Sequence, residues 1–435
     1  MRPIHLSTLL LALTVLVSGC VAVQAALQLQ QLAQQQVEHG PVGSSQPAEQ
    51  LGTTASPGPQ ALGTVSHDEA HPLFSMLRFV PADPLYRPYL TLGDVSAWHT
   101  ATGVPRVESL ADVEQLEPAQ RNGWRFALFK QTHPPQTLGL EYLAVEEMRD
   151  FYGFGFFDAD RYLEAGAPPD TISVLQVHAN LETIKSRLTR FGYTWDDAPG
   201  GRLYSIRDDY ETDLRSPTLV GRLAGLNRIA VLDDGLLVIG RAAEVVTNAV
   251  AARQGKLPSL ADESVYQSAA AALTGPTVSD LGALVGVILV GEPFLADPFM
   301  LLDQSDEAAQ EQFERYVENP LPLYLLAAFA TYRAGETIHL TLALVFPSGV
   351  DAEEAAATLA ARLQDYSSPI SGRVLDEYWQ YQSATGVEAG GLPVALVTMR
   401  LNQPEEDLPG APFAWVDLVS RRDLLFLAPG TPLVR

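Results

Sequence analysis

The sequence is poor in cysteine, in lysine and in positive charge. Its single cysteine, Cys20, excludes an intramolecular disulfide framework and any cysteine-rich zinc or iron–sulfur site. The 435 residues hold 28 bases against 52 acids, and the only lysines are Lys130, Lys185 and Lys256. The resulting net charge of −24 repels polyphosphate, because nucleic-acid affinity comes largely from lysine and arginine side chains that release counterions. Nucleic acid is therefore excluded as a main partner.

Charge of either sign is also scarce, and apolar side chains are plentiful. Charged residues make up 18% of the chain, below the roughly 25% of an average soluble protein. Apolar residues make up 47%, which is enough for a sizeable core and excludes wholesale disorder. The length suggests two or three domains of about 150 residues each.

The common catalytic and cofactor-binding motifs are absent from the sequence. It has no Gly-x-Ser-x-Gly elbow, no Gly-rich phosphate loop, no Gly-x-Gly-x-x-Gly after a predicted strand and no His-Glu-x-x-His. His178 and His339 lie in or beside predicted strands, where a hydrogen-bonded structural histidine is favoured over a general base. The sequence therefore assigns no catalytic residue, no cofactor and no metal.

The N-terminus has the pattern of an export signal. Arg2 supplies a short positive region, and Leu6 to Val17 form an apolar stretch of signal-peptide length. Val17-Ser18-Gly19-Cys20 then places small residues directly before the cysteine, which resembles the lipobox of bacterial lipoproteins. The resemblance implies that residues 1–19 are removed, that Cys20 carries a lipid and that residues 20–435 remain.

A second interpretation of the same segment stays open. Apolar residues continue to Leu27, so Leu6 to Leu27 is long enough for an uncleaved membrane helix. Both interpretations predict a body held at the cell membrane and facing outside the cytoplasm, with the membrane as a partner through a lipid or signal anchor.

Residues 20–72 are predicted to be a flexible spacer behind the anchor. Residues 28–72 are rich in Gly, Ser, Pro, Thr and Gln and contain hardly any aromatic side chain, so they cannot offset the entropy cost of ordering. His67 and His71 have the spacing of one helical face, as in some metal sites, but no third ligand is near. A solvated linker is therefore favoured over a metal site.

From residue 73 onward, alternating and helical patterns predict a folded body. Strands are expected at 171–177, 201–206, 228–240 (as a hairpin turning at Asp234-Gly235), 282–290, 337–346 and 393–401. Helices are expected after Asn180, over 242–255 and after Asp351, and a further hairpin is expected over 413–429. The acidic stretch from Asp303 to Glu318 predicts a connecting helix.

The expected order of strand, helix, strand and hairpin occurs twice, over 171–240 and 337–429. We therefore predict an α+β protein of two related domains, 73–295 and 296–435, each an antiparallel sheet with helices packed on one face. A coincidental recurrence of a common order is the alternative, because residue identity between the two stretches is slight.

Two clusters of side chains are candidate binding sites. The carboxylates of the stretch RDDYETDLRSP have the oxygen ligands that calcium prefers, but they lack the ligand order and glycine of an EF-hand, so a solvated acidic loop is favoured; they are Asp208, Asp209, Glu211 and Asp213. The aromatic run FYGFGFF (151–157) has rings that can stack on a sugar or a peptide, yet packing at the edge of a core is favoured.

A third cluster, DEYWQYQ, places two acids beside aromatic side chains, a composition found at carbohydrate sites. Asp376 and Glu377 are adjacent on one element, whereas glycoside hydrolysis needs two carboxyl groups that flank the scissile bond about 5–10 Å apart. Asp376 and Glu377 are the candidate catalytic residues for an alternative to a non-catalytic role, in which the protein is an extracytoplasmic hydrolase of a cell-wall or sugar polymer.

Three passages of the body resemble bacterial lipoproteins that carry domains of unknown function on a long spacer. They are VPADP (80–84), GFGFFDADRYLEAGAPPD (153–170) and SLADESVYQ (259–267). The resemblance implies no activity and assigns no functional residue. The favoured expectation is a membrane-tethered envelope protein with a non-catalytic binding or scaffold role, whose partner is a protein or a small molecule.

Overall fold

The structure is a computed structural model that describes residues 71–122, 124, 128–139, 145–291, 307–401 and 415–429. Residues from Pro72 onward belong to one compact unit. The expected signal sequence, Cys20 and all but the end of the expected spacer lie outside the described residues. Within the ranges given above, no helix is both long enough and apolar enough to cross a membrane.

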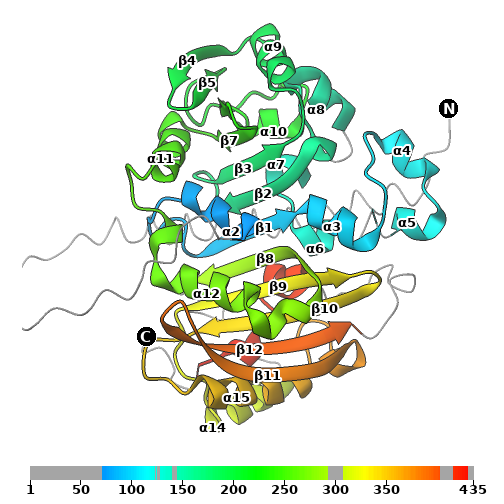
Figure 1. The fold of residues 1–435 in the computed structure, drawn as a ribbon, viewed down its shortest axis with the longest axis vertical. Helices are drawn as coiled ribbons and strands as arrows, with labels where there is room; N and C mark the ends of the chain where they lie inside the picture. The colour runs from blue at the N-terminus through cyan, green and yellow to red at the C-terminus, as the bar shows by residue number, and fades with distance from the viewer. Residues whose placement is uncertain are drawn as a thin grey trace, which may run out of the picture. The chain divides into compact units, whose positions relative to one another are not determined.

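Twelve strands of the described chain form one sheet in which every neighbouring pair is antiparallel. Figure 1 shows the strands side by side, from β4 at one end to β11 at the other, with β1 and β8 in the middle. In chain order they are β1 Tyr89–Asp94, β2 Ala159–Ala165, β3 Ile172–Val177, β4 Thr194–Ala198, β5 Gly201–Ser205, β6 Arg228–Leu232, β7 Leu236–Gly240, β8 Ala283–Gly291, β9 Leu326–Ala334, β10 Thr337–Val345, β11 Trp379–Ala389 and β12 Leu392–Leu401.

Helices cover both faces of the sheet. On one face, a single core runs under the strands of both halves, because alternate residues such as Leu163, Val174 and Ala328 point to this side. The helices that close this core are α2 Pro72–Ser75, η2 Met76–Phe79, α11 Ala243–Arg253, η6 Leu260–Asp262, α12 Ser264–Thr274 and η7 Pro276–Leu281. The intervening residues, such as Tyr162 and Phe329, point to the opposite face.

The opposite face carries two separate cores, one over the N-terminal strands and one over the C-terminal strands. The remaining helices are α3 Val95–Thr102, α4 Leu110–Gln115, α5 Pro118–Asn122, α6 Leu128–Thr132, α7 Gln136–Gly139, α8 Val145–Tyr152, η5 Phe156–Asp158, α9 Leu181–Phe191, α10 Leu219–Arg222, α14 Glu307–Glu318, α15 Ala352–Gln364, η8 Leu375–Glu377, α16 Trp415–Arg421 and η10 Leu425–Leu427. The expectation of helices on one face is therefore wrong, since strands such as β6 and β8 are apolar on both sides and need cover on both.

The two halves of the sheet repeat one connection pattern. In the first half, hairpin β2–β3 leads through α9 to β4, β5 and β6, and the chain returns as β7 beside β3. In the second half, hairpin β9–β10 leads through α15 to β11, and the chain returns as β12 beside β10. The antiparallel pair of β1 and β8 joins the halves.

An α+β architecture built on antiparallel strands is confirmed, but the division into two domains is not. All twelve strands share one sheet, and one of the three cores spans both halves. The boundary expected between residues 295 and 296 lies in a stretch outside the described residues. The helix expected at Asp303 to Glu318 is present as α14 over the described part of that range.

Several local predictions are confirmed with their capping residues. Asn180 accepts hydrogen bonds from the first turn of α9, and Asp351 does the same for α15. The hairpin of β6 and β7 turns at Gly235, whose φ is +85°, in the left-handed region that favours glycine.

The hairpin expected over 413–429 is wrong in its described part. Residues 415–421 form α16, and a 3₁₀ turn, η10, follows. Trp415, Leu418 and Val419 are buried at helical spacing, so one apolar face packs against the sheet. A short apolar run of this kind is compatible with the two-residue period of a strand and with the 3.6-residue period of a helix. The burial of one stripe of side chains favours the helix.

Candidate functional site

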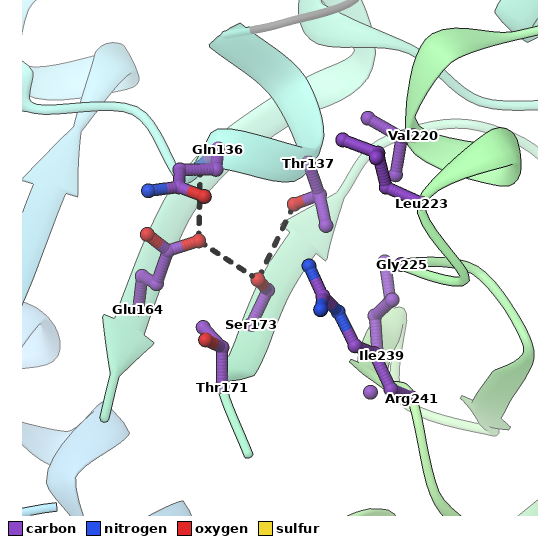
Figure 2. Close-up of a pocket in the computed structure, with 11 residues that line it drawn as sticks. Gln136, Thr137, Glu164, Thr171, Ser173, Val220, Leu223, Gly225, Ile239 and Arg241 are labelled. Carbon is purple, nitrogen blue, oxygen red and sulfur yellow. Dashed lines mark hydrogen bonds between the residues drawn. The ribbon is translucent and has the colours of Figure 1, made fainter. Parts of the chain in front are cut away.

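A small pocket opens on the face of the sheet that carries two cores, at one end of β2, β3 and β7. The paired strands place Glu164, Ser173 and Ile239 in one row, because Glu164 is opposite Ser173 and Ser173 is opposite Ile239. Figure 2 shows these side chains under α7 and the segment that contains α10. The pocket is lined by Gln136, Thr137, Glu164, Thr171, Ser173, Val220, Leu223, Gly225, Ile239, Gly240 and Arg241.

A chain of hydrogen bonds runs along the polar wall of the pocket and ends on Glu164. The hydroxyl of Thr137 donates to the Ser173 hydroxyl at 3.3 Å, and Ser173 donates to Oε2 of Glu164 at 3.2 Å. The same carboxylate oxygen accepts the backbone N–H of Gln136 at 2.9 Å. These bonds fix the position of the carboxylate, as the dashed lines in Figure 2 show.

Glu164 is the carboxyl group in the pocket whose protonation changes near neutral pH. Burial raises the pKa of Glu164 to about 7, while its two hydrogen-bond donors and the positive charge of Arg241 act in the opposite direction. Desolvation dominates because the side chain leaves water for a wall made mostly of hydroxyls and aliphatic groups. Near neutral pH, the Glu164 side chain is therefore present partly as the neutral acid and partly as the carboxylate.

Arg241 brings the positive charge to the pocket. It directly follows β7, and its guanidinium is directed toward Ser173 and Thr137 (Figure 2). Within the described residues, no carboxylate lies within 4 Å of this guanidinium. Burial lowers the pKa of Arg241, and the charges of Glu164 and Asp170 partly offset that effect from a greater distance. An arginine stays protonated at neutral pH, so Arg241 contributes a positive charge to the pocket.

The other wall is apolar, and the space is limited. Val220, Leu223 and Ile239 supply aliphatic surface, and Leu223 is 42% exposed at the mouth. The cavity volume of the pocket is about 40 Å³. That room corresponds to on the order of three waters, so a small group fits and a polymer chain does not.

Thr171 adds a second polar group without a partner. Its hydroxyl oxygen is buried and has no hydrogen bond within the described residues. A buried hydroxyl without a partner costs free energy, which a bound water or ligand recovers. The pocket therefore offers a guanidinium and a hydroxyl that the protein itself leaves unused.

The acidic cluster is used for structure and does not converge. Asp213 pairs with Arg207, and Asp209 pairs with Arg228 at 2.7 Å while accepting the N–H of Ala243 at 3.0 Å. Glu211 accepts the N–H of Asp208 at 3.2 Å. Among the described residues, no three histidine, cysteine, aspartate or glutamate side chains gather as a metal site. The carboxylates hold their own loop and the start of α11.

The aromatic run at 151–157 packs in the core, as favoured. Tyr152, Phe154, Phe156 and Phe157 are each at most 5% exposed. Phe157 stacks on Trp124 at 5.4 Å between ring centroids. Rings buried in this way present no face to a sugar or a peptide.

The acids proposed for glycan hydrolysis lie on a surface turn. Asp376 and Glu377 are exposed on η8, directly before β11. Trp379, which follows them, is 3% exposed and packs against Trp415 at 4.8 Å. Of the aromatic side chains in this cluster, Trp379 is part of the core, Tyr378 is half-buried and Tyr381 is 39% exposed. The two acids are neighbours on one short turn and do not face each other across a cleft, so the geometry does not favour a hydrolase site here.

Sequence reasoning missed the pocket entirely. Glu164 and Arg241 are far apart in the chain, and the pairing of β2, β3 and β7 brings them together. Glu164 falls within the passage 153–170 quoted above, but that resemblance assigned it no function. The one local signal was an acid within the strand ADRYLEA, at a position that alternation places on a covered face. His178 is near Asp160, with 3.2 Å between Nδ1 and the carboxylate, and forms no part of the pocket.

Comparison with known proteins gives little. No family model matches the chain, and no curated protein matches it. Two solved structures of TP0453 are similar at a low level. Crystal form I has a TM-score of 0.33 and 7% identity, covering 82% of this chain and 99% of that one. Crystal form III has a TM-score of 0.29 and 8% identity, covering 76% and 95%.

Proposed function

We propose that the protein is a membrane-tethered envelope protein that binds a small molecule without converting it. The binding site is the pocket of Arg241, Glu164 and Thr171. The observation that carries this proposal is the Arg241 guanidinium, which reaches a solvent-open pocket with no ion pair among the described residues. Burial penalises this cation, and the carboxylates of Glu164 and Asp170 offset the penalty only from beyond ion-pair distance, so an anionic ligand that paired with it directly would stabilise it further.

Several features of the pocket favour binding over catalysis. Ser173 is the hydroxyl nearest to a carboxylate base, but its side chain is 1% exposed and both its donor and its acceptor are in use. A nucleophile must reach the substrate, and a general base must face the proton it takes. The hydroxyl chain instead serves to hold Glu164 in place.

The tethered part of the proposal rests on the resemblance of residues 17–20 to a lipobox. Lipidation at this position would hold the body at the membrane surface, and the spacer that precedes the folded unit would give it reach. Replacement by serine, Cys20→Ser, should abolish incorporation of labelled fatty acid. Retention of the variant on membranes with an uncleaved N-terminus would favour the signal anchor instead.

The binding part is tested by capture of ligands from a membrane-fraction extract. The full chain and its Leu223→Trp variant are immobilised, washed and eluted, and the eluted small molecules are identified by mass spectrometry. Leu223 is the matched position because it is partly exposed at the pocket mouth, where a larger side chain narrows the entrance without disturbing the core.

We expect a compound that the wild type retains and the Leu223→Trp variant does not, recovered with its mass unchanged. Equal retention by both proteins, or no retention, would remove the binding role of the pocket. Appearance of a converted product in the wild-type eluate would favour an enzyme.

A further inference from the structure

The chemistry of the pocket restricts what it can hold. One guanidinium faces two hydroxyls that are already bonded to one another, a third hydroxyl that is free, and an aliphatic wall. Glu164, the only acid among the described residues that line the pocket, has its position fixed by donors from α7 and β3. A ligand must therefore bring a negative group to Arg241 and apolar atoms to the wall.

Resting on the binding function above, we propose that the pocket takes a carboxylate group on a short aliphatic chain. The carboxylate lies against the fork of Arg241 and accepts the hydroxyl of Thr171. The chain lies along Val220, Leu223 and Ile239. A planar guanidinium matches a planar carboxylate through two parallel N–H···O bonds, so both orientation and charge are satisfied.

A singly charged anion fits better than phosphate. Arg241 is the one cation among the described residues that line the pocket, and the negative charges of Glu164 and Asp170 already act on it. A doubly charged anion would place a second negative charge near these carboxylates with no second cation to balance it. The small free volume and the aliphatic wall also disfavour a strongly hydrated group.

The charged and titratable groups around Glu164 act together on this anion. Arg241 faces Glu164 across the pocket, and Asp170 lies in the turn between β2 and β3. Burial and, to a lesser extent, the charge of Glu164 raise the pKa of Tyr89 on β1. Tyr89 and Arg241 keep their charge states between pH 6 and pH 8, since their pKa values lie above that range. Protonation of Glu164 is then the change that makes the pocket more positive.

Two sources supply such a carboxylate, namely a free short-chain acid and the C-terminus of a peptide. Butyrate represents the first, and a Leu-Val dipeptide represents the second. Their neutral counterparts, butyramide and the amidated dipeptide, have the same shape without the charge. Inorganic phosphate tests the competing class of anion.

The experiment is isothermal titration of the full chain in detergent with these five probes at pH 6. We expect butyrate, the dipeptide or both to bind, and the corresponding amide to bind at least about tenfold more weakly, because it cannot pair with Arg241. Binding of butyrate alone identifies a free acid, and a marked preference for the dipeptide identifies a peptide C-terminus.

Three variants assign the binding to Arg241. Arg241→Gln should weaken binding at least about tenfold, and Arg241→Lys should restore part of it, because charge is kept while the fork is lost. Arg400→Gln, near the exposed end of β12, changes the net charge by the same amount as Arg241→Gln. This control should leave binding unchanged. Thermal unfolding of each variant shows that the fold is retained, and Leu223→Trp provides a second block should Arg241→Gln not fold.

Failure of this inference is distinct from failure of the proposed function. Equal binding of amide and acid, preference for phosphate, or full binding by Arg241→Gln would overturn the carboxylate proposal. If a compound without a carboxylate is captured from the extract in a pocket-dependent manner, the binding function stands and the ligand class is wrong. If the pocket captures nothing and binds no probe, both are wrong.

Discussion

Gly93 of β1 and Gly286 of β8 lie directly opposite each other at the junction of the two halves of the sheet. A Cβ on Gly93 would lie 2.0 Å from the carbonyl oxygen of Thr132, and one on Gly286 would lie 1.9 Å from that of Gln131. The end of α6 therefore rests on the bare backbone of the pair. This close approach fixes the helix that leads into α7 and hence the donor that α7 gives to Glu164.

We predict that Gly286→Ala lowers the free energy of unfolding by about 1–3 kcal/mol, because the added methyl group meets backbone atoms that cannot rotate away. The matched control is Gly139→Ala at the end of α7, where a Cβ meets nothing within 4 Å. Chemical denaturation of both variants measures the difference. Equal stability of Gly286→Ala and the wild type would contradict the close packing of α6.

Arg362 joins the C-terminal helices through its buried guanidinium. It donates to the carbonyl oxygens of Tyr316 at 2.6 Å, Asn319 at 2.7 Å and Ala428 at 2.7 Å, and burial lowers its pKa to about 10. Arg362→Met leaves these acceptors without a donor, and we expect a loss of about 3–5 kcal/mol.

The matched control for Arg362 is Arg315→Met, on the exposed side of α14. We expect this variant to unfold within about 0.5 kcal/mol of the wild type in the same denaturation assay. A similar loss in both variants would show that the carbonyl contacts of Arg362 contribute nothing specific.

Asp423 anchors the loop after α15. Its carboxylate accepts the hydroxyl of Tyr366 at 2.5 Å and that of Ser368, and burial raises its pKa. Asp423→Asn turns one acceptor into a donor that faces a hydroxyl, so we expect a loss of about 1–3 kcal/mol in unfolding free energy. The exposed neighbour variant Asp365→Asn should change little, and an equally small effect at Asp423 would refute the anchoring role.

Glu164 makes stability depend on pH in the absence of ligand. Its pKa is about 7 in the folded state against an ordinary value of 4.5, so folding favours the protonated form. Its contribution to stability is full below about pH 4.5 and is lost as pH rises to about 7. Thermal unfolding from pH 4.5 to pH 8 should show this loss in the wild type.

Glu164→Gln should abolish the loss of stability between pH 4.5 and pH 7. At pH 8 the variant should be more stable than the wild type, since the amide oxygen still accepts from Gln136 and Ser173 and no charge is buried. The exposed Glu388→Gln variant, on β11, should keep the wild-type profile. An unchanged profile in Glu164→Gln would show that Glu164 titrates at its ordinary pKa.

Local sequence patterns predicted the elements with strong periodicity and clear caps. Helix α15 begins where Asp351 accepts its first N–H groups, and β6–β7 turns at Gly235, because these preferences act over a few residues. Helix α16 was missed, since its apolar residues fit both a strand and a short helix until the sheet buries one stripe.

The single sheet and the pocket depend on contacts between distant segments. Nothing local to β1 or β8 indicates that they pair, yet this pairing joins the two halves. Glu164 and Arg241 likewise meet only because β3 lies between β2 and β7. A repeat of element order was visible in the sequence, whereas the merging of its copies into one sheet was not.

The most direct test of the account is the dissociation constant of butyrate for the full chain at pH 6 and at pH 8. Butyrate stays ionised over this range, since its carboxyl group titrates near the pKa of glutamate side chains. We predict binding about tenfold tighter at pH 6, where Glu164 is largely protonated, and a pH-independent constant for Glu164→Gln. Absence of binding by both butyrate and the Leu-Val dipeptide at both pH values, or a wild-type constant that does not change with pH, would contradict a carboxylate site beside Glu164.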